Sequence, residues 1–329
     1  MDIIIYPPTI NWTFMKQRPQ QLMKKFADSG YKVFYCNQTQ TEKDIEEISP
    51  NLFIVHNHDQ WLKEILPKAR KNKKVGIWCS WAKLASTLKK YEPNWIIYDC
   101  VDEFADWIKY EPEMVKIADA IVCTAERLKK KLQNNYPTKR TELIRNAYDP
   151  EMMLHENSKD IIIPKKKIGY IGAWAPWIDE ELISRLARTL NYVEIEIIGI
   201  EFGKKFNLHH IPNIKFLGHK PHSELPNFLK NYSLCIIPFR INPITLATNP
   251  VKMYEYLATG HPVVSTNLPE CYLAQPYVDV ANNHVDFINK VRNRLQNPGN
   301  SLERKQFALN NTWSHRVNQA IHLIREISK

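Results

Sequence analysis

The segment from Asn249 to Val264 carries the residue types best suited to chemistry in this chain. Pro250 stands where a helix can begin, Asn249 is a favoured N-cap residue, and Gly260 ends the helix before an apolar strand. The free backbone N–H groups and the dipole of such a helix attract an anion to its first turn, where Lys252 adds a full positive charge. Glu255, one turn later on the same face, could accept two hydrogen bonds from a diol such as a ribose.

The same spacing also fits a plainer interpretation. Lys252 and Glu255 are three residues apart, so they could form a surface ion pair on an ordinary helix. Residue types and spacing alone leave both interpretations open.

Glycine is scarce in the chain, with nine residues in 329, and neither G-x-x-x-x-G-K-[ST] nor G-x-G-x-x-G occurs. The nearest pattern is Gly169-Tyr170-Ile171-Gly172, where an expected strand ends. Its glycines could let a ligand approach the backbone, or they could ease the packing of a strand against a helix. The sequence does not decide between these two roles.

The sequence pattern alternates apolar, strand-like runs with amphipathic, helix-like segments. This alternation predicts a parallel α/β sheet as the scaffold for these residues. In the first half we expect strands at residues 3–6, 32–36, 52–56, 75–79, 95–99, 120–124 and 142–145. Helices are expected between them at residues 19–29, 60–69, 82–91, 113–118 and 125–135.

Periodicity is lost over residues 146–164, which gather Asn, Pro, His and Glu as an exposed interdomain segment would. It then restarts, with strands expected at 167–171, 193–198, 214–217, 234–238 and 262–265 and helices at 178–189, 223–231, 250–259 and 284–296. We therefore predict two domains, residues 1–155 and 156–311. A helix with an apolar stripe at 312–329 could pack back on the first domain.

Composition argues against several classes of protein. No apolar run approaches the 18 residues of a membrane-spanning helix, and Asp2 stands where a signal peptide needs a base. The six cysteines include no C-x-x-C pair, and no H-E-x-x-H occurs. We therefore expect a cytoplasmic protein with buried, reduced thiols and no bound metal.

The net charge is +10, and most of it lies in residues 165–329. Basic clusters at residues 71–74 and 129–131 are either solvated helix ends or a surface for anionic partners, meaning phosphates or an acidic membrane. No helix-turn-helix, zinc-finger or RNP-type motif accompanies the charge, so nucleic acid is not an expected partner.

The pattern N-P-V-K-x-x-E-Y-L-A-x-G-x-P-V-V at residues 249–264 strongly resembles the donor-binding helix of glycosyltransferases with the GT-B fold. Five further motifs resemble those of bacterial cell-surface polysaccharide transferases of the teichuronic-acid type, in the same order, at residues 17–22, 98–103, 145–149, 168–172 and 237–240. The resemblance covers most of the chain. It implies an α/β protein of two Rossmann-like, doubly wound domains that face each other across a cleft.

The resemblance also implies roles for particular residues. Lys252 and the backbone amides near it would hold the donor diphosphate, and Glu255 would bind the nucleotide ribose. The implied donor-binding residues in the second domain are Gly172, Arg240, Asn249, Pro250, Val251, Lys252 and Glu255. The first domain would bind the acceptor, with Trp12 and Arg18 on its side of the cleft.

The catalytic base is harder to assign. Retaining members of the family carry an acid eight residues before this glutamate, where this chain has Ala247. A first-domain carboxylate then becomes the candidate that takes the acceptor proton. Asp99 and Asp102 lie at the carboxyl end of the strand expected at 95–99, and we choose Asp102 because Asp99 could be capping the loop. Retention or inversion of the sugar stays open.

The predicted function is transfer of a sugar from a nucleotide donor, by resemblance UDP, to a hydroxyl of a cell-surface glycan or lipid-linked acceptor. No cofactor or metal is expected, and the inner membrane face is the expected place of work. Two alternatives stay open: a nucleotide-sugar 2-epimerase on the same fold, and a non-enzymatic, two-lobed sugar-binding protein.

Overall fold

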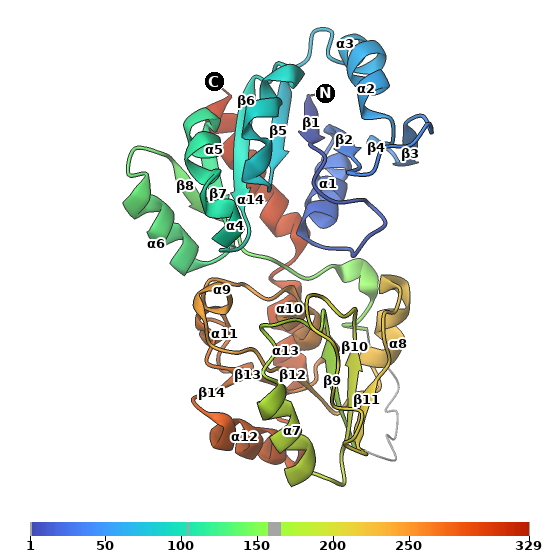
Figure 1. Cartoon of the computed structure of the whole chain (residues 1–329), viewed down its shortest axis with the longest axis vertical. Helices are drawn as coiled ribbons and strands as arrows, with labels where there is room; N and C mark the ends of the chain where they lie inside the picture. The colour runs from blue at the N-terminus through green and yellow to red at the C-terminus, as the bar shows by residue number, and fades with distance from the viewer. Residues whose placement is uncertain (1, 104, 157–165, 329) are drawn as a thin grey trace. The chain divides into compact units, whose positions relative to one another are not determined.

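The computed structural model describes residues 2–103, 105–156 and 166–328 (Figure 1). It divides the chain into two compact units: unit 1 is Met1–Asn146 with Trp313–Lys329, and unit 2 is Ala147–Thr312. The division falls nine residues before the expected one, because Tyr148 is buried in the core of unit 2 and its backbone N–H donates to the Asn311 carbonyl at 2.9 Å. Residues 157–164 of the expected interdomain segment lie outside the described residues.

Unit 1 is built on an eight-stranded sheet of order β3-β4-β2-β1-β5-β6-β7-β8. All neighbouring strands are parallel except the edge pair β3 and β4. The strands are β1 (Ile3–Tyr6), β2 (Lys32–Cys36), β3 (Glu46–Ser49), β4 (Leu52–Val55), β5 (Val75–Cys79), β6 (Trp95–Cys100), β7 (Ala120–Cys123) and β8 (Thr141–Leu143). The central strands are apolar runs because helices cover both faces of a parallel sheet.

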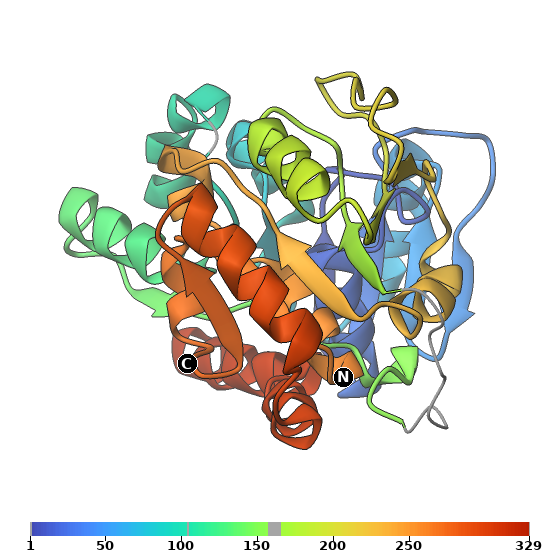
Figure 2. The same cartoon turned by 90° about the horizontal axis from the view of Figure 1, so that it is seen from below.

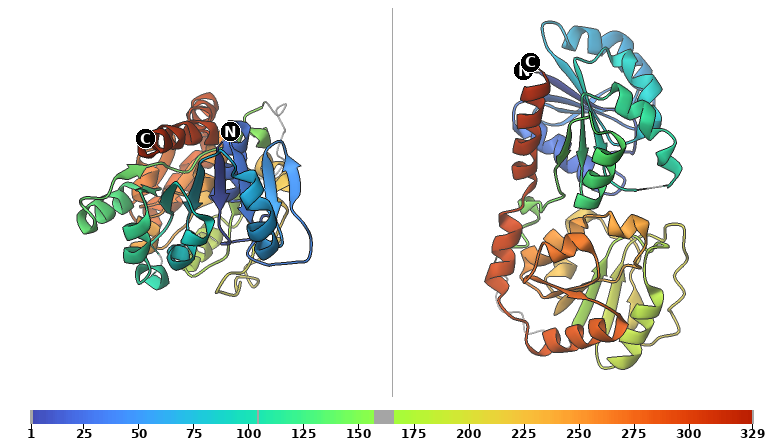
Figure 3. Two further views of the ribbon diagram at one scale, coloured as in Figure 1. Left: turned by 90° about the horizontal axis from the view of Figure 1, so that it is seen from above. Right: turned by 90° about the vertical axis from the view of Figure 1, so that its left-hand side faces the viewer.

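The helices of unit 1 are α1 (Arg18–Asp28), α2 (His58–Gln60), α3 (Leu66–Ala69), α4 (Ala105–Ile108), α5 (Glu111–Ile117), α6 (Glu126–Asn135) and α14 (Trp313–Ile327). The helix expected at 60–69 is interrupted by a π-helical turn at Trp61–Ile65, and Ala82–Tyr91 is a 3₁₀ helix. The C-terminal helix α14 packs against α1, as the right-hand view of Figure 3 shows. Segments from the two ends of the chain therefore share one core.

Unit 2 contains a six-stranded parallel sheet of order β11-β10-β9-β12-β13-β14. Its strands are β9 (Lys167–Ile171), β10 (Glu194–Ile198), β11 (Ile214–Phe216), β12 (Leu234–Ile237), β13 (Val263–Thr266) and β14 (Val278–Ala281). The chain winds outward from β9 in one direction and then, from β12, in the other. In such sheets ligands bind at the carboxyl ends of the strands, where the order reverses.

The helices of unit 2 are α7 (Glu180–Thr189), α8 (Leu225–Leu229), α9 (Pro243–Leu246), α10 (Val251–Thr259), α11 (Pro269–Tyr272), α12 (His284–Gln296) and α13 (Ser301–Leu309). Helix α10 packs on α13, and α7 packs on α12. Figure 2 shows unit 2 from below, with α7 in yellow-green and α12 in orange-red toward the viewer. Because parallel strands feed these helices, the first turn of each long helix lies near the edge of the sheet where the loops gather.

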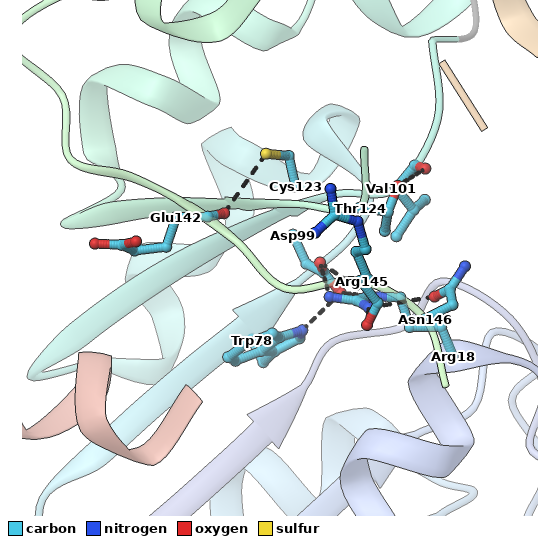
Figure 4. Close-up of polar contacts among 9 residues, drawn as sticks. All are labelled: Arg18, Trp78, Asp99, Val101, Cys123, Thr124, Glu142, Arg145 and Asn146. Carbon is cyan, nitrogen blue, oxygen red and sulfur yellow. Dashed lines mark hydrogen bonds and ion pairs between the residues drawn. The ribbon is translucent and has the colours of Figure 1, made fainter. Parts of the chain in front are cut away.

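A buried ion pair links the parts of unit 1 (Figure 4). Arg18, at the start of α1, donates from Nε and Nη2 to the Asp99 carboxylate at 2.9 Å, and the Trp78 indole donates to the same carboxylate at 2.8 Å. Arg18 Nη1 also donates to the Asn146 side chain at 3.2 Å, and Arg316 of α14 donates to the Asn146 carbonyl. One carboxylate thus connects strands, α1 and the chain segment that contacts α14.

We predict that Asp99→Asn destabilises unit 1, because it leaves the Arg18 guanidinium buried without a full counter-charge. Breaking one side of a buried pair costs about 3–5 kcal/mol, and urea unfolding should show a loss of that order. Asp106→Asn, at an exposed position of α4, is the matched control and should unfold like the wild type. Unchanged stability of Asp99→Asn together with lost turnover would contradict this structural role.

Candidate functional site

Helix α10 is held at both ends by local structure. It ends at Gly260, whose φ of +81° lies in the left-handed region that glycine adopts without strain. At its start the prediction of an Asn249 cap is wrong, because the N-cap is Pro250, which makes no side-chain cap bond. The buried Asn249 amide instead donates to the Glu270 carboxylate at 2.9 Å and to the Tyr254 hydroxyl at 3.3 Å. Asn249 therefore ties α10 to α11.

The Lys252 side chain lies against the end of β9. Its ammonium is 4.9 Å from the centre of the Phe239 ring and 5.5 Å from that of Tyr170. A Cβ on Gly172 would stand 2.9 Å from Lys252 Cε and 3.0 Å from Nζ, and Gly172 has a φ of +150°. Glycine is therefore favoured at 172 by the backbone conformation, and a larger residue there would also displace the end of the Lys252 side chain.

The loops that follow β9 and β10 are packed tightly together at the same edge. The Gly172 N–H donates to the Ile198 carbonyl at 2.9 Å, and the Gly199 N–H donates to the Gly218 carbonyl at 2.9 Å. A Cβ on Gly199 would fall 1.9 Å from the Gly172 carbonyl oxygen, so no side chain fits there. We call Gly172, Gly199 and Lys252 the lysine cradle.

The two glycines of the Gly169–Gly172 pattern have different roles. A Cβ on Gly169 would stand 2.1 Å from Cδ2 of the buried Tyr232 ring, so this glycine serves packing. Gly172 is the one that stands beside a charged side chain. The packing interpretation is confirmed for Gly169, and a ligand-approach role for Gly172 stays a prediction.

Glu255 lies on α10 with its side chain 13% exposed, and its Oε1 is 3.9 Å from Nε2 of His222. His222 begins the turn before α8, in the connection that follows β11. The next residue, Tyr256, fixes the helix to β9, because its hydroxyl accepts from the Ile171 N–H at 2.7 Å and donates to the Ile171 carbonyl at 3.3 Å. Lys252 and Glu255 thus point to different loops, and sequence reasoning missed His222 and Tyr256.

The remaining sequence-predicted donor residues lie around this edge. Arg240 is exposed after β12, and its backbone N–H donates to the Trp177 carbonyl at 2.8 Å. Val251 is half-buried in the first turn of α10. Ala247, the position of the acid in retaining relatives, is fully buried.

A hollow of about 460 Å³ opens over the carboxyl ends of β12, β13 and β14. Phe239, which touches the lysine cradle, also lines the hollow, so the two adjoin. At its far side the Asp179 carboxylate accepts from the Leu182 N–H as the N-cap of α7 and lies 2.8 Å from His284 Nε2. The other lining residues are Arg185, Ile241, Thr266, Asn267, Ala281, Asn282, Asn283 and Val285.

In unit 1 two of the predicted site residues, Arg18 and Asp99, pair with each other in the interior. Arg18 is 4% exposed and Asp99 is fully buried, so the ion pair described above occupies both. Both side chains are withdrawn from the surface, which disfavours the predicted roles of Arg18 in acceptor binding and of Asp99 in catalysis.

The other two unit 1 candidates are better exposed. Asp102 is half-buried in the segment that follows β6, where the chain has no regular structure. Trp12 is also half-buried, with its ring centre 5.1 Å from that of Tyr35 in a T-shaped arrangement and its backbone N–H donating to the Asn37 side-chain oxygen at 2.8 Å.

Some classes of site are not seen in the described part of the chain. No group of three or more His, Cys, Asp or Glu side chains there could hold a metal ion. All six cysteines are buried and unbridged, as expected, and burial raises the pKa of the Cys79 thiol to about 12. Over the same residues, no helix is long and apolar enough to cross a membrane.

Comparison with known proteins points to one class of enzyme. Residues 165–297 match the family described as Glycosyl transferases group 1. The chain is 24% identical over 299 residues to a Bacillus subtilis (strain 168) protein, TuaH, named as a glycosyltransferase of teichuronic acid biosynthesis, covering 80% of this chain and 75% of that protein.

Solved structures show the same architecture. The Anabaena protein HepE, determined with UDP and glucose, superimposes with a TM-score of 0.72 at 11% identity, over 99% of this chain and 100% of that one. WaaG, a glycosyltransferase of lipopolysaccharide biosynthesis, gives 0.67 at 11% identity over 98% and 99%, and the trehalose-6-phosphate synthase OtsA gives 0.69 at 10% over 99% of both.

The family match and the relative support a glycosyltransferase enzyme, and the solved structures establish the architecture. The chain has the GT-B fold, and its residues 165–297 match the model of the Glycosyl transferases group 1 family.

Proposed function

We propose that this chain transfers a sugar from a UDP donor to a hydroxyl group of a cell-surface glycan or a lipid-linked acceptor. The observation that carries the proposal is the lysine cradle beside Glu255, at the carboxyl edge of the unit 2 sheet. Support for the chemistry comes from HepE, determined with UDP and glucose, and from the naming of TuaH for teichuronic acid biosynthesis.

In this proposal the cradle stabilises the leaving group. When the bond from the sugar to the diphosphate breaks, negative charge grows on the UDP oxygens. The Lys252 ammonium and the first N–H groups of α10 are already in place to receive that charge, so little reorganisation is needed. Gly172 and Gly199 keep the backbone free of side chains where the diphosphate approaches. This arrangement needs no metal, so turnover should survive a chelator.

Turnover assays with and without acceptor test the proposal. We expect one or more UDP-sugars to give UDP rapidly only when an acceptor such as a lipid extract of bacterial envelopes is present. Conversion of the donor to its 2-epimer without acceptor would identify an epimerase instead. Binding of sugar without any turnover would identify a sugar-binding protein.

We predict that Lys252→Ala weakens UDP binding measured by calorimetry. Loss of a charge-assisted contact to phosphate costs about 2 kcal/mol, equivalent to about 30-fold in Kd. Lys215→Ala is the control, because Lys215 is an exposed lysine of the same unit that pairs with Glu194. Wild-type affinity in Lys252→Ala would remove Lys252 from the site.

The catalytic base is proposed to be Asp102, since Asp99 is committed to Arg18. We predict that Asp102→Asn lowers turnover about 100-fold to 10,000-fold, as expected for loss of a general base, and leaves the Kd for UDP unchanged. Glu103→Gln, at the neighbouring carboxylate that pairs with Lys131 at 2.9 Å, is the matched control. Near-normal turnover in Asp102→Asn would exclude Asp102 as the base and favour a retaining mechanism.

The net charge of +10 supports a further part of the proposal, attachment to the acidic inner face of a membrane. We predict that the protein floats with vesicles containing phosphatidylglycerol at low salt, and that the bound fraction falls as salt screens the attraction. Vesicles of phosphatidylcholine are the control. If the protein floated with neither kind of vesicle, membrane attachment would be contradicted.

A further inference from the structure

His222 carries a buried polar atom that the fold does not satisfy. Its Nε2 is shielded from solvent and has no hydrogen-bond partner among the described residues. A buried donor or acceptor without a partner destabilises the folded state, so a site that keeps one needs an explanation. Oε1 of the Glu255 carboxylate lies 3.9 Å from this nitrogen.

A distance of 3.9 Å is longer than a hydrogen bond, which needs about 2.7–3.2 Å between the heavy atoms. A shift of about 1 Å would close the gap. Both side chains are mostly buried, His222 at 23% and Glu255 at 13% exposure, so they have few other arrangements available. They come from different segments, α10 and the turn before α8, and only the fold brings them together.

We propose that His222 is a positioning residue for Glu255 and donates from Nε2 to Oε1 when a nucleotide is bound. This rests on the proposed function, in which Glu255 accepts from the ribose hydroxyls. An ionised carboxylate has about four lone-pair sites, so Oε1 can accept from His222 and from one hydroxyl while Oε2 accepts from the other. His222 thereby fixes the plane of the Glu255 carboxylate. A carboxylate held in that plane favours ligands that carry both ribose hydroxyls.

The proposal predicts that loss of His222 weakens the binding of a nucleotide with ribose hydroxyls but not of one without them. Calorimetry with UDP and with 2′,3′-dideoxy-UDP measures how much affinity the two hydroxyls contribute. In the wild type we expect UDP to bind about 10-fold or more tightly than the dideoxy compound. In His222→Ala the affinity for UDP should fall about fivefold, and that for dideoxy-UDP should stay unchanged, since the diphosphate contacts are intact.

Three further variants distinguish positioning from a general structural role. His222→Gln retains an N–H donor and should recover part of the preference for UDP. In a Glu255→Ala background, His222→Ala should have no further effect, because the residue through which it acts is gone. His219→Ala, at the exposed histidine three residues earlier, is the matched control and should bind both ligands like the wild type.

Equal weakening of both ligands in His222→Ala, or an unchanged ratio of their affinities, would overturn the role of His222 while leaving the nucleotide site intact. A wild type that binds neither ligand would overturn the proposed function itself, and the role of His222 with it. Melting temperatures of the variants show whether each has folded.

Discussion

The close contact between Lys252 and Gly172 is the constraint on which the proposed donor site depends. Gly172 has a φ of +150° that strains any other residue, a side chain there would displace the end of the lysine, and a side chain at 199 would collide with the backbone of 172. The lysine itself belongs to a helix that Tyr256 fixes to β9 and Asn249 fixes to α11. Charge, backbone and helix are therefore held in one arrangement before any ligand arrives, which is what electrostatic preorganisation requires.

Unit 1 uses its charges differently. Arg18 and Asp99 look like site residues in the sequence because charged groups at a strand end and a helix start are typical of active sites. In the structure their side chains form a buried ion pair. Its hydrogen bonds connect α1, β5 and β6 to the segment that contacts α14. Asp102, a few residues beyond, is half-buried and remains the carboxylate proposed as the base.

Much of the fold could be predicted because parallel strands buried on both faces are continuous apolar runs. The strands β3 and β14 escaped prediction, since Glu46, Glu47 and Asp279 interrupt the apolar pattern at the edges of the sheets. Spacing alone left Lys252 and Glu255 of α10 open between a ligand site and a surface ion pair, and it was the family resemblance that singled them out as candidates. The Asn249 cap was wrong because the helix begins one residue later, with Pro250 at the N-cap position, and His222 was missed because 33 residues separate it from Glu255.

The position of UDP in a crystal of the complex tests the central claim most directly. The account predicts the diphosphate within hydrogen-bond distance of Lys252 Nζ, against the backbone of Gly172, with the ribose hydroxyls on Glu255. A diphosphate bound instead in the hollow between Asn282 and Arg185, with Lys252 untouched, would contradict it.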